Sequence, residues 1–358
     1  MPKGILERLA EGPVLGDGGY LLELEKRGYV QAGPFTPEVV IEHPEALAQL
    51  HREFLRAGAD VLQTMTFYAS DDKLATVGLQ GTVDEINRSA VRIARDVAAE
   101  GDALVAGNLS LTWAYDPDDS QSSDHVRSLI DRQLQDQLDA GPPDFWIGET
   151  FSYLGEALLF VERAKATGLP VMVTMSFEML PAKAYEGDTP TECARRLADA
   201  GADVVGVNCL NGPLQQLPIA VEMVRAVRGA VPVATQPVAY ATTKDRPDFT
   251  SWPNFPYSLT PMTLARGDLA EFARNAREAG VRYIGSCCGA VAEHVRAMAK
   301  ALDKVQEQER GWRSPTGKAM SAYEYYDHTE TEVPPEREVD AVDVATERTR
   351  QEIQEAFE

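Results

Sequence analysis

The sequence predicts a (β/α)8 barrel with a C-terminal extension, and two observations lead to this fold class. First, one unit recurs eight times: a short apolar run, an amphipathic helical pattern and then glycine. Second, the runs are apolar on both faces, which is typical of parallel strands covered by helices. A doubly wound open sheet is the alternative, but no GxGxxG turn follows the first run. Eight such units therefore favour a closed barrel.

The eight runs are the expected strands, and they span 14–20, 60–68, 104–110, 145–151, 171–177, 204–210, 231–237 and 283–289. Helical patterns lie between them, with Pro, Asp, Ser or Thr near their starts and Gly at their ends. The first of these starts at Pro44 and stops at Gly58. Two long segments, 21–43 and 238–261, follow the first and seventh strands and are rich in aromatic residues and proline. We expect both to cover a substrate at the active face of the barrel.

The composition limits the function classes. The chain has 358 residues, 44% of them hydrophobic, which is enough for a large domain. Its formal net charge of -22 disfavours binding to nucleic acid or to anionic membranes. The first residues are too polar for a secretory signal, and no apolar run has transmembrane length, so we expect a cytoplasmic protein. The barrel pattern covers residues 1–310, and 311–358 form an acidic C-terminal arm or tail.

Three of the four cysteines fall at the ends of predicted strands. Cys209 ends the sixth run, and Cys287 and Cys288 end the eighth, whereas Cys193 lies in a helical pattern. Because the carboxyl ends of barrel strands share one mouth, we expect the first three to converge there. Three thiolates suit a tetrahedral Zn²⁺ whose fourth position stays open for a substrate. Their spacing is not that of a zinc finger, and three buried unreactive cysteines are the alternative.

Other polar and aromatic residues at strand ends are expected around the same mouth: Asp17, Tyr68, Asn108, Glu149 and Gln236. None of the five histidines ends a strand, and we expect surface or capping positions for those on helices, including His51. This pattern disfavours a hydrolase site built on histidine.

Several stretches resemble the homocysteine S-methyltransferase family, and within it the enzymes that use betaine. They are GDGGYLLELEKRGYV, AGPFTPE, IEHPEAL, QLHREFLRAGADVLQTMTFYASDDKL, GDALVAG, GVNC and GVRYIGSCCG. The resemblance runs from about residue 11 to 300, and the pairing of GVNC with CC is specific to the family's zinc site. It implies a zinc-dependent barrel that moves a methyl group from a small onium donor to the sulfur of homocysteine, giving methionine.

The resemblance also implies roles for individual residues. The family's zinc ligands fall on Cys209, Cys287 and Cys288. Its carboxylates for the homocysteine ammonium fall on Asp17 and Glu149, and a tyrosine near the metal falls on Tyr68. We assign Glu149 and Tyr68 to catalysis, although Tyr68 could simply pack at the rim. Gly18 and Gly19 would let the backbone approach the substrate closely, or would only form a tight turn.

Two positions depart from the betaine-using enzymes. Aromatic faces normally hold a quaternary ammonium, but Phe35 replaces the tryptophan of their AGPWTPE motif and Thr150 replaces the tyrosine after the strand-four glutamate. Trp113, Phe151 or Trp252 could compensate.

Glycine betaine, leaving as dimethylglycine, is the expected donor. Dimethylsulfoniopropionate, S-methylmethionine and proline betaine are alternatives, and a non-catalytic onium-binding barrel is an alternative of another class. The C-terminal region does not match that of the animal enzymes, so a homo-oligomer is possible but not implied.

Overall fold

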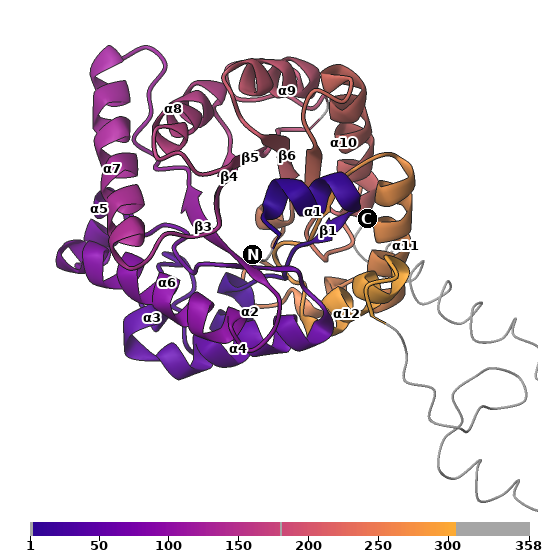
Figure 1. The fold of residues 1–358 in the computed structure, drawn as a ribbon, viewed down its shortest axis with the longest axis horizontal. Coiled ribbons are helices and arrows are strands. Elements are labelled where there is room, and N and C mark those ends of the chain that lie inside the picture. Colours follow the sequence, from indigo (N-terminus) through magenta and orange to yellow (C-terminus); the bar gives the residue numbers. More distant parts are fainter. Residues whose placement is uncertain (1–2, 180, 306–358) are drawn as a thin grey trace, which may run out of the picture. The chain divides into compact units, whose positions relative to one another are not determined.

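The computed structural model describes residues 3–179 and 181–305, and they fold into an eight-stranded parallel sheet ringed by helices (Figure 1). The strand order is β1-β8-β7-β6-β5-β4-β3-β2. This arrangement confirms the predicted (β/α)8 barrel. Every strand lies within one of the predicted runs: β1 (Val14–Leu15), β2 (Val61–Gln63), β3 (Leu104–Ser110), β4 (Phe145–Phe151), β5 (Val171–Met175), β6 (Val204–Asn208), β7 (Val233–Gln236) and β8 (Tyr283–Ile284). The predicted arm or tail, 311–358, lies outside the described residues.

The main helices begin and end at the expected residue types. Helix α4 has Pro44 in its first turn and ends at Gly58, whose φ of 108° is left-handed. Helix α9 begins with a capping box between Thr189 and Glu192. The α-helices are α1 (Ile5–Glu11), α2 (Leu21–Lys26), α3 (Val39–Glu42), α4 (Pro44–Ala57), α5 (Asp71–Ala75), α6 (Val83–Ala98), α7 (Ser120–Asp139), α8 (Leu154–Lys165), α9 (Pro190–Asp199), α10 (Pro213–Val227), α11 (Arg266–Glu278) and α12 (Ala292–Ala301). Short 3₁₀ turns are η1 (Gln80–Thr82), η2 (Phe249–Ser251) and η3 (Thr260–Met262).

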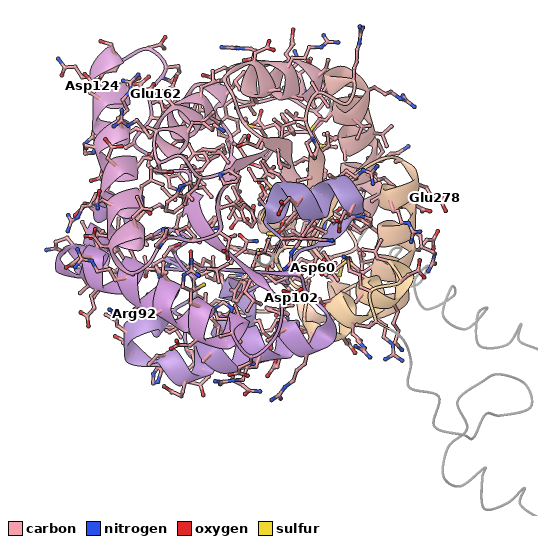
Figure 2. All side chains as sticks on the ribbon, viewed as in Figure 1. Asp60, Arg92, Asp102, Asp124, Glu162 and Glu278 are labelled. Atoms are coloured by element: carbon pink, nitrogen blue, oxygen red, sulfur yellow. The ribbon has the colours of Figure 1, made fainter. Side chains whose placement is uncertain are left out.

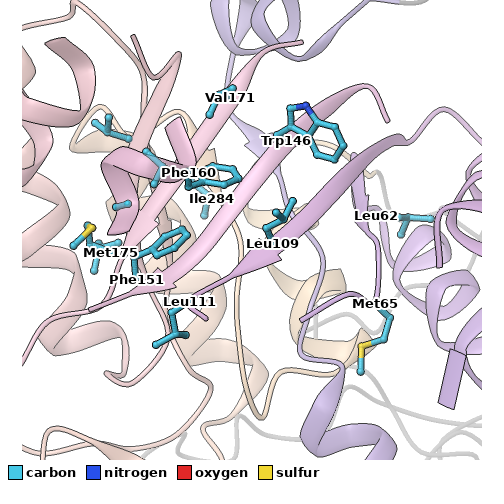
Figure 3. Packing of buried hydrophobic residues seen from close by; sticks show 14 of the residues in the cluster. Leu62, Met65, Leu109, Leu111, Trp146, Phe151, Phe160, Val171, Met175 and Ile284 are labelled. Carbon is cyan, nitrogen blue, oxygen red and sulfur yellow. The ribbon is translucent and has the colours of Figure 1, made fainter. Parts of the chain in front are cut away.

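Two apolar layers hold the barrel. Between the sheet and the helices, outward strand residues such as Leu62, Trp146 and Ile284 form one apolar cluster with helical side chains such as Phe160; Figure 3 labels these four residues. Inside the barrel, a separate cluster is formed by inward residues of the strands and by Ile5 and Leu9 of α1. Because side chains alternate along a strand, each strand contributes to both layers.

Helix α1, which the sequence analysis did not predict, closes the N-terminal end of the barrel. Figure 1 shows it lying across the ring of strands, and Ile5 and Leu9 are almost fully buried in the interior cluster. Arg8 fixes the helix by an ion pair of 2.9 Å to Asp102, one of the residues labelled in Figure 2. This helix therefore covers the end of the barrel opposite to the one at which the strands end.

The join between β1 and β2 relies on side chains. The backbone contributes one hydrogen bond, from the Asp60 amide to the Leu15 carbonyl (2.8 Å). The Asp60 carboxylate accepts from the Leu15 amide (2.7 Å), and the Asp17 carboxylate accepts from the Gln63 amide (2.8 Å). Two aspartates thus replace the hydrogen-bond ladder that joins the other neighbouring strands.

No helix in the described part of the chain is long and apolar enough to cross a membrane.

Candidate functional site

The barrel interior changes from apolar to polar toward the ends of the strands. Along β3, inward Leu104 and Ala106 belong to the interior apolar cluster, and the next inward residue is Asn108. Every second residue of a strand points to the same side. The inward residues of β2, β4, β5, β6 and β7 likewise change from apolar to polar toward the carboxyl end of the strand. The polar layer at the mouth consists of Gln63, Asn108, Glu149, Thr174, Asn208 and Gln236, with Asp17 after β1; all are buried except Glu149, which is partly exposed.

The three cysteines at strand ends meet at this mouth. The Sγ atoms of Cys209 and Cys288 are 3.9 Å apart, as are those of Cys287 and Cys288. All three Sγ atoms lie within 4.8 Å of one another. Tetrahedral bonds of about 2.3 Å to zinc would place sulfur atoms about 3.8 Å apart, so the thiols fit such an ion. The cluster could hold a metal and has no fourth His, Cys, Asp or Glu ligand among the described residues.

Two carboxylates face the same space. Burial raises the pKa of Asp17 to about 6 and that of Glu149 to about 7. The Glu149 carboxylate accepts from Asn108 Nδ2 (2.5 Å) and Asn208 Nδ2 (3.3 Å). The Asp17 carboxylate accepts hydrogen bonds from the backbone amide and the side-chain Nε2 of Gln63, both neutral. Its negative charge adds to the rise in the pKa of Glu149. The pair lacks a cationic partner among the described residues, so an incoming ammonium group would be favoured here.

Asp17 is also part of a buried chain of hydrogen bonds that the sequence analysis missed. The Tyr20 hydroxyl donates to Asp17 Oδ2 and lies 3.0 Å from His51 Nδ1. His51 is fully buried, so the expected surface or capping position is wrong for it. Burial lowers the pKa of His51 to about 3, so its imidazole is neutral at neutral pH. The GDGGY motif could have suggested a role for Tyr20, but the partner on α4 is distant in sequence.

Gly18 and Gly19 lie where the chain passes under the cysteine pair. A Cβ on Gly19 would approach the Cys287 carbonyl oxygen to 2.8 Å, and one on Gly18 would approach the Phe54 ring to 2.6 Å. Glycine is required here for close approach to the protein's own atoms. Contact with a substrate stays a prediction for both.

Strained residues lie near the ends of β2, β4 and β6: Thr150 is within the last residues of β4, and Tyr68 and Cys209 follow β2 and β6. Tyr68, Thr150 and Cys209 have φ values of 61°, 64° and 57°, which are left-handed and unfavourable for side chains. A hydrogen bond from a neighbouring strand or loop fixes each backbone amide: Ser110 Oγ accepts from Tyr68, Asn208 Oδ1 from Thr150, and the Gln236 carbonyl from Cys209. This strain is concentrated at the site.

The two long segments predicted to cover the site pack against each other over the thiols. The rings of Phe35, from the first segment, and Phe255, from the second, have centroids 6.0 Å apart. Both pack against a buried cluster that includes Cys209, and Cys287 and Cys288 pack against the same cluster. A cavity of about 440 Å³ opens beside this cover, and Leu210 and Tyr185 are among the residues that line it.

The comparisons with known proteins agree with this geometry. The family model described as homocysteine S-methyltransferase matches residues 14–302. The chain belongs to the homocysteine S-methyltransferase family. It is therefore an enzyme of this family, and the match covers the whole barrel, including both cysteine segments.

Curated relatives of this methyltransferase are similar over most of their length. Betaine–homocysteine S-methyltransferase 1 of Danio rerio is 48% identical over 84% of this chain and 76% of the relative. The Mus musculus protein of the same name is 45% identical, over 90% and 79%. S-methylmethionine–homocysteine S-methyltransferase BHMT2 of Pongo abelii is 41% identical, over 90% and 86%. The metallated homocysteine methyltransferase MmuM of Escherichia coli has the same fold, with a TM-score of 0.65, 21% identity and coverage of 82% and 99%.

The aromatic residues that could replace the missing members of a methyltransferase donor site lie in different environments. Phe151 is buried against Phe160 in the outer core, and Trp252 is buried against Tyr240 inside the second covering segment. Trp113 is 57% exposed at the mouth. Thr150 is held by Asn208, whose Nδ2 donates to its Oγ1 at 2.8 Å. Of the three candidates, Trp113 alone is exposed at the mouth.

Proposed function

We propose that this chain transfers a methyl group from a small onium donor to the sulfur of homocysteine, giving methionine. Glycine betaine is the first candidate donor and would leave as dimethylglycine. The observation that carries the proposal is the cluster of three thiols at the mouth of the barrel, beside the carboxylates of Asp17 and Glu149, which lack a cationic partner in the described structure. Membership of the family supports the reaction class.

Cys209, Cys287 and Cys288 would hold a zinc ion at this mouth. Bound there, zinc would lower the pKa of the homocysteine thiol and stabilise its thiolate at neutral pH. Without a cation the three thiols disfavour ionisation: hydrogen bonding with Cys209, followed by burial, raises the pKa of Cys287 well above its usual range. Three sulfur ligands therefore suit a soft metal ion.

Asp17 and Glu149 would bind the homocysteine ammonium and orient the sulfur toward the thiol cluster. Tyr68, whose pKa burial raises to about 12, keeps its hydroxyl protonated and able to donate a hydrogen bond. Gly18 and Gly19 would bring the backbone near the amino-acid part of the substrate. The side chain of Gln236 has no partner for either amide atom among the described residues, and it offers a further polar group there.

The covering segments would place the donor. Transfer forms the sulfur–carbon bond and breaks the bond from the methyl carbon to nitrogen or sulfur, whose electron pair stays with the leaving amine or thioether. That leaving group departs neutral, so no side chain has to protonate it. The contribution of the chain is then mainly position and exclusion of water, and Phe35 and Thr150 are the proposed contacts of the donor.

A different donor is the second candidate, with the same acceptor and metal. One relative, 41% identical, is named for S-methylmethionine, and Phe35 and Thr150 weaken the expected cage for a quaternary ammonium. Initial rates with glycine betaine, dimethylsulfoniopropionate, proline betaine and S-methylmethionine would identify the donor. We place the enzyme in the cytoplasm, where thiols stay reduced, and light scattering would determine whether it forms a homo-oligomer.

The test is metal content together with methyl transfer. Purified wild-type chain should contain about one zinc per chain and produce methionine. Replacing Cys209, Cys287 or Cys288 by alanine should remove the zinc and the activity and leave the far-ultraviolet circular dichroism unchanged, because these side chains lie outside the main core. Cys193→Ala is the matched control, since Cys193 is buried in α9. A zinc-free wild type that still forms methionine would contradict the proposal.

A further inference from the structure

The ammonium group of Lys73 lies over two aromatic rings at the mouth, those of Tyr68 and Trp113. Lys73 lies on α5, and its Nζ atom is 4.3 Å from the centroid of the Tyr68 ring and 5.1 Å from that of Trp113. Both distances are within the range of cation–π contacts. Tyr68 follows β2 and Trp113 follows β3, so two neighbouring strands position the ammonium group at the mouth.

This ammonium group has no acidic partner in the described part of the chain. The acidic residues beside it pair elsewhere: Asp71 pairs with Arg132, and Asp72 lies 2.7 Å from His125, both on α7. Burial lowers the pKa of Lys73, and no carboxylate opposes the shift. A half-buried lysine without a carboxylate is notable in a chain with 56 acidic and 34 basic residues. Lys73 is thus free to pair with an anion from outside.

The Tyr68 side chain shares the mouth of the barrel with the thiol cluster. Tyr68 follows β2, and its amide donates to Ser110 Oγ at the end of β3 (3.1 Å). Cys209 and Cys288 follow β6 and β8. After burial, the charges of these two cysteines add to the rise in the pKa of Tyr68. A molecule that contacts Lys73 along Tyr68 would therefore lie in the same mouth as the three sulfur atoms.

We propose that Lys73 binds the carboxylate of the methyl donor, so that the enzyme selects onium carboxylates over onium cations that lack a carboxylate. This assignment rests on the proposed function. In this orientation the negative end of the donor meets the unpaired ammonium, and its onium methyl groups point toward the thiols and the two carboxylates. Glycine betaine and dimethylsulfoniopropionate belong to the selected class, whereas choline and trimethylsulfonium do not.

A binding measurement tests the carboxylate contact without methyl transfer. The probe is 3,3-dimethylbutanoate, which has the shape and carboxylate of glycine betaine but no positive charge. Calorimetry on the zinc-loaded full chain with homocysteine present should show binding to the wild type. Lys73→Met should weaken it about tenfold or more, since a charge-assisted hydrogen bond is lost. Lys73→Arg should largely retain it. Lys183→Met, which removes an exposed charge after β5, should change it little.

Kinetics with paired donors provides the second readout. The KM for dimethylsulfoniopropionate should rise about tenfold or more in Lys73→Met, with a smaller change in kcat, and the values for trimethylsulfonium should stay the same. Equal binding of 3,3-dimethylbutanoate to wild type and Lys73→Met would overturn the proposal. So would tighter binding of choline to Lys73→Met, because the rings would then be an onium site that Lys73 blocks. If no donor methylates homocysteine but the probe binding still depends on Lys73, the proposed function fails and the carboxylate site stands.

Discussion

The ionised carboxylates of Asp17 and Glu149 lower the stability of the fold, and they are the groups proposed to bind the substrate ammonium. Both accept hydrogen bonds from neutral donors, and burial raises both pKa values. A carboxyl group whose pKa is higher in the folded state is destabilised when it ionises. The metal-free chain should therefore lose stability as the pH rises from about 4 through about 7. The ammonium of a substrate would offset this cost.

Glu149→Gln tests the trade-off. At pH 8 the variant should raise the free energy of unfolding of the metal-free chain by about 1–3 kcal/mol, since it removes a charge that burial disfavours. At pH 5, where wild-type Glu149 is protonated, the two chains should be nearly equal. Urea unfolding at both pH values measures this. Homocysteine binding should weaken at pH 8, and an unchanged or lower stability there would contradict the account.

Among the elements, the two covering segments are the proposed contacts of the methyl donor. Phe35 and Phe255, which are far apart in the sequence, pack against each other and against the apolar cluster that includes Cys209. Phe35 also has a left-handed φ of 50°, so its ring is held in place by an unusual backbone conformation. The two segments are coupled because the ring of Phe35 in the first packs against the ring of Phe255 in the second.

Phe35→Trp tests whether this cover sets donor choice. An indole face attracts a quaternary ammonium more strongly than a phenyl face does, so the KM for glycine betaine should fall several-fold. Tyr257→Trp is the control, because Tyr257 is exposed in the second segment and should leave the KM unchanged. Steady-state rates at saturating homocysteine measure both. An unchanged or higher KM in Phe35→Trp would show that the cage lies elsewhere.

At the scale of the molecule, a repeated aspartate joins strands at the closed end of the barrel. Asp60, Asp144 and Asp203 each precede an even-numbered strand, and their carboxylates accept from the amides of Leu15, Val105 and Val171 on the preceding strand. At β3–β4 and β5–β6 a ladder of backbone pairs adds to this contact. At β1–β2 the carboxylates carry most of the join, and Asp60 also pairs with Lys304 at 2.5 Å.

Asp60→Ala should therefore cost more than the same change at Asp144. The first leaves the Leu15 amide and Lys304 without their partner and should lower the free energy of unfolding by about 2–4 kcal/mol. Asp144→Ala, where β3 and β4 remain paired along five residues, should cost about 1 kcal/mol. Urea unfolding of both variants provides the comparison. Equal costs would mean that the β1–β2 join is not the weak point.

The sequence was sufficient for those features that follow from chain direction and period. Parallel strands must end on one side, so Cys209 and Cys287 could be placed together from their positions alone. Contacts between distant side chains could not be predicted in this way. Tyr20 reaches His51, and Lys73 reaches Trp113, through geometry that no local pattern records. The two-residue lengths of β1 and β8 also escaped prediction, because the chain leaves the sheet at glycines 16 and 285.

The Asp17 carboxylate joins β1 to β2 by accepting a hydrogen bond from the Gln63 amide, and the same carboxylate is the proposed binding partner of the acceptor's amino group. Evolution cannot easily change one role without the other. A change of the acceptor that altered Asp17 would also require a new contact between β1 and β2. A change of the methyl donor would require substitutions only in the covering segments. Among descendants of such a scaffold, we expect the methyl source to diversify while the amino acid that receives it stays constant.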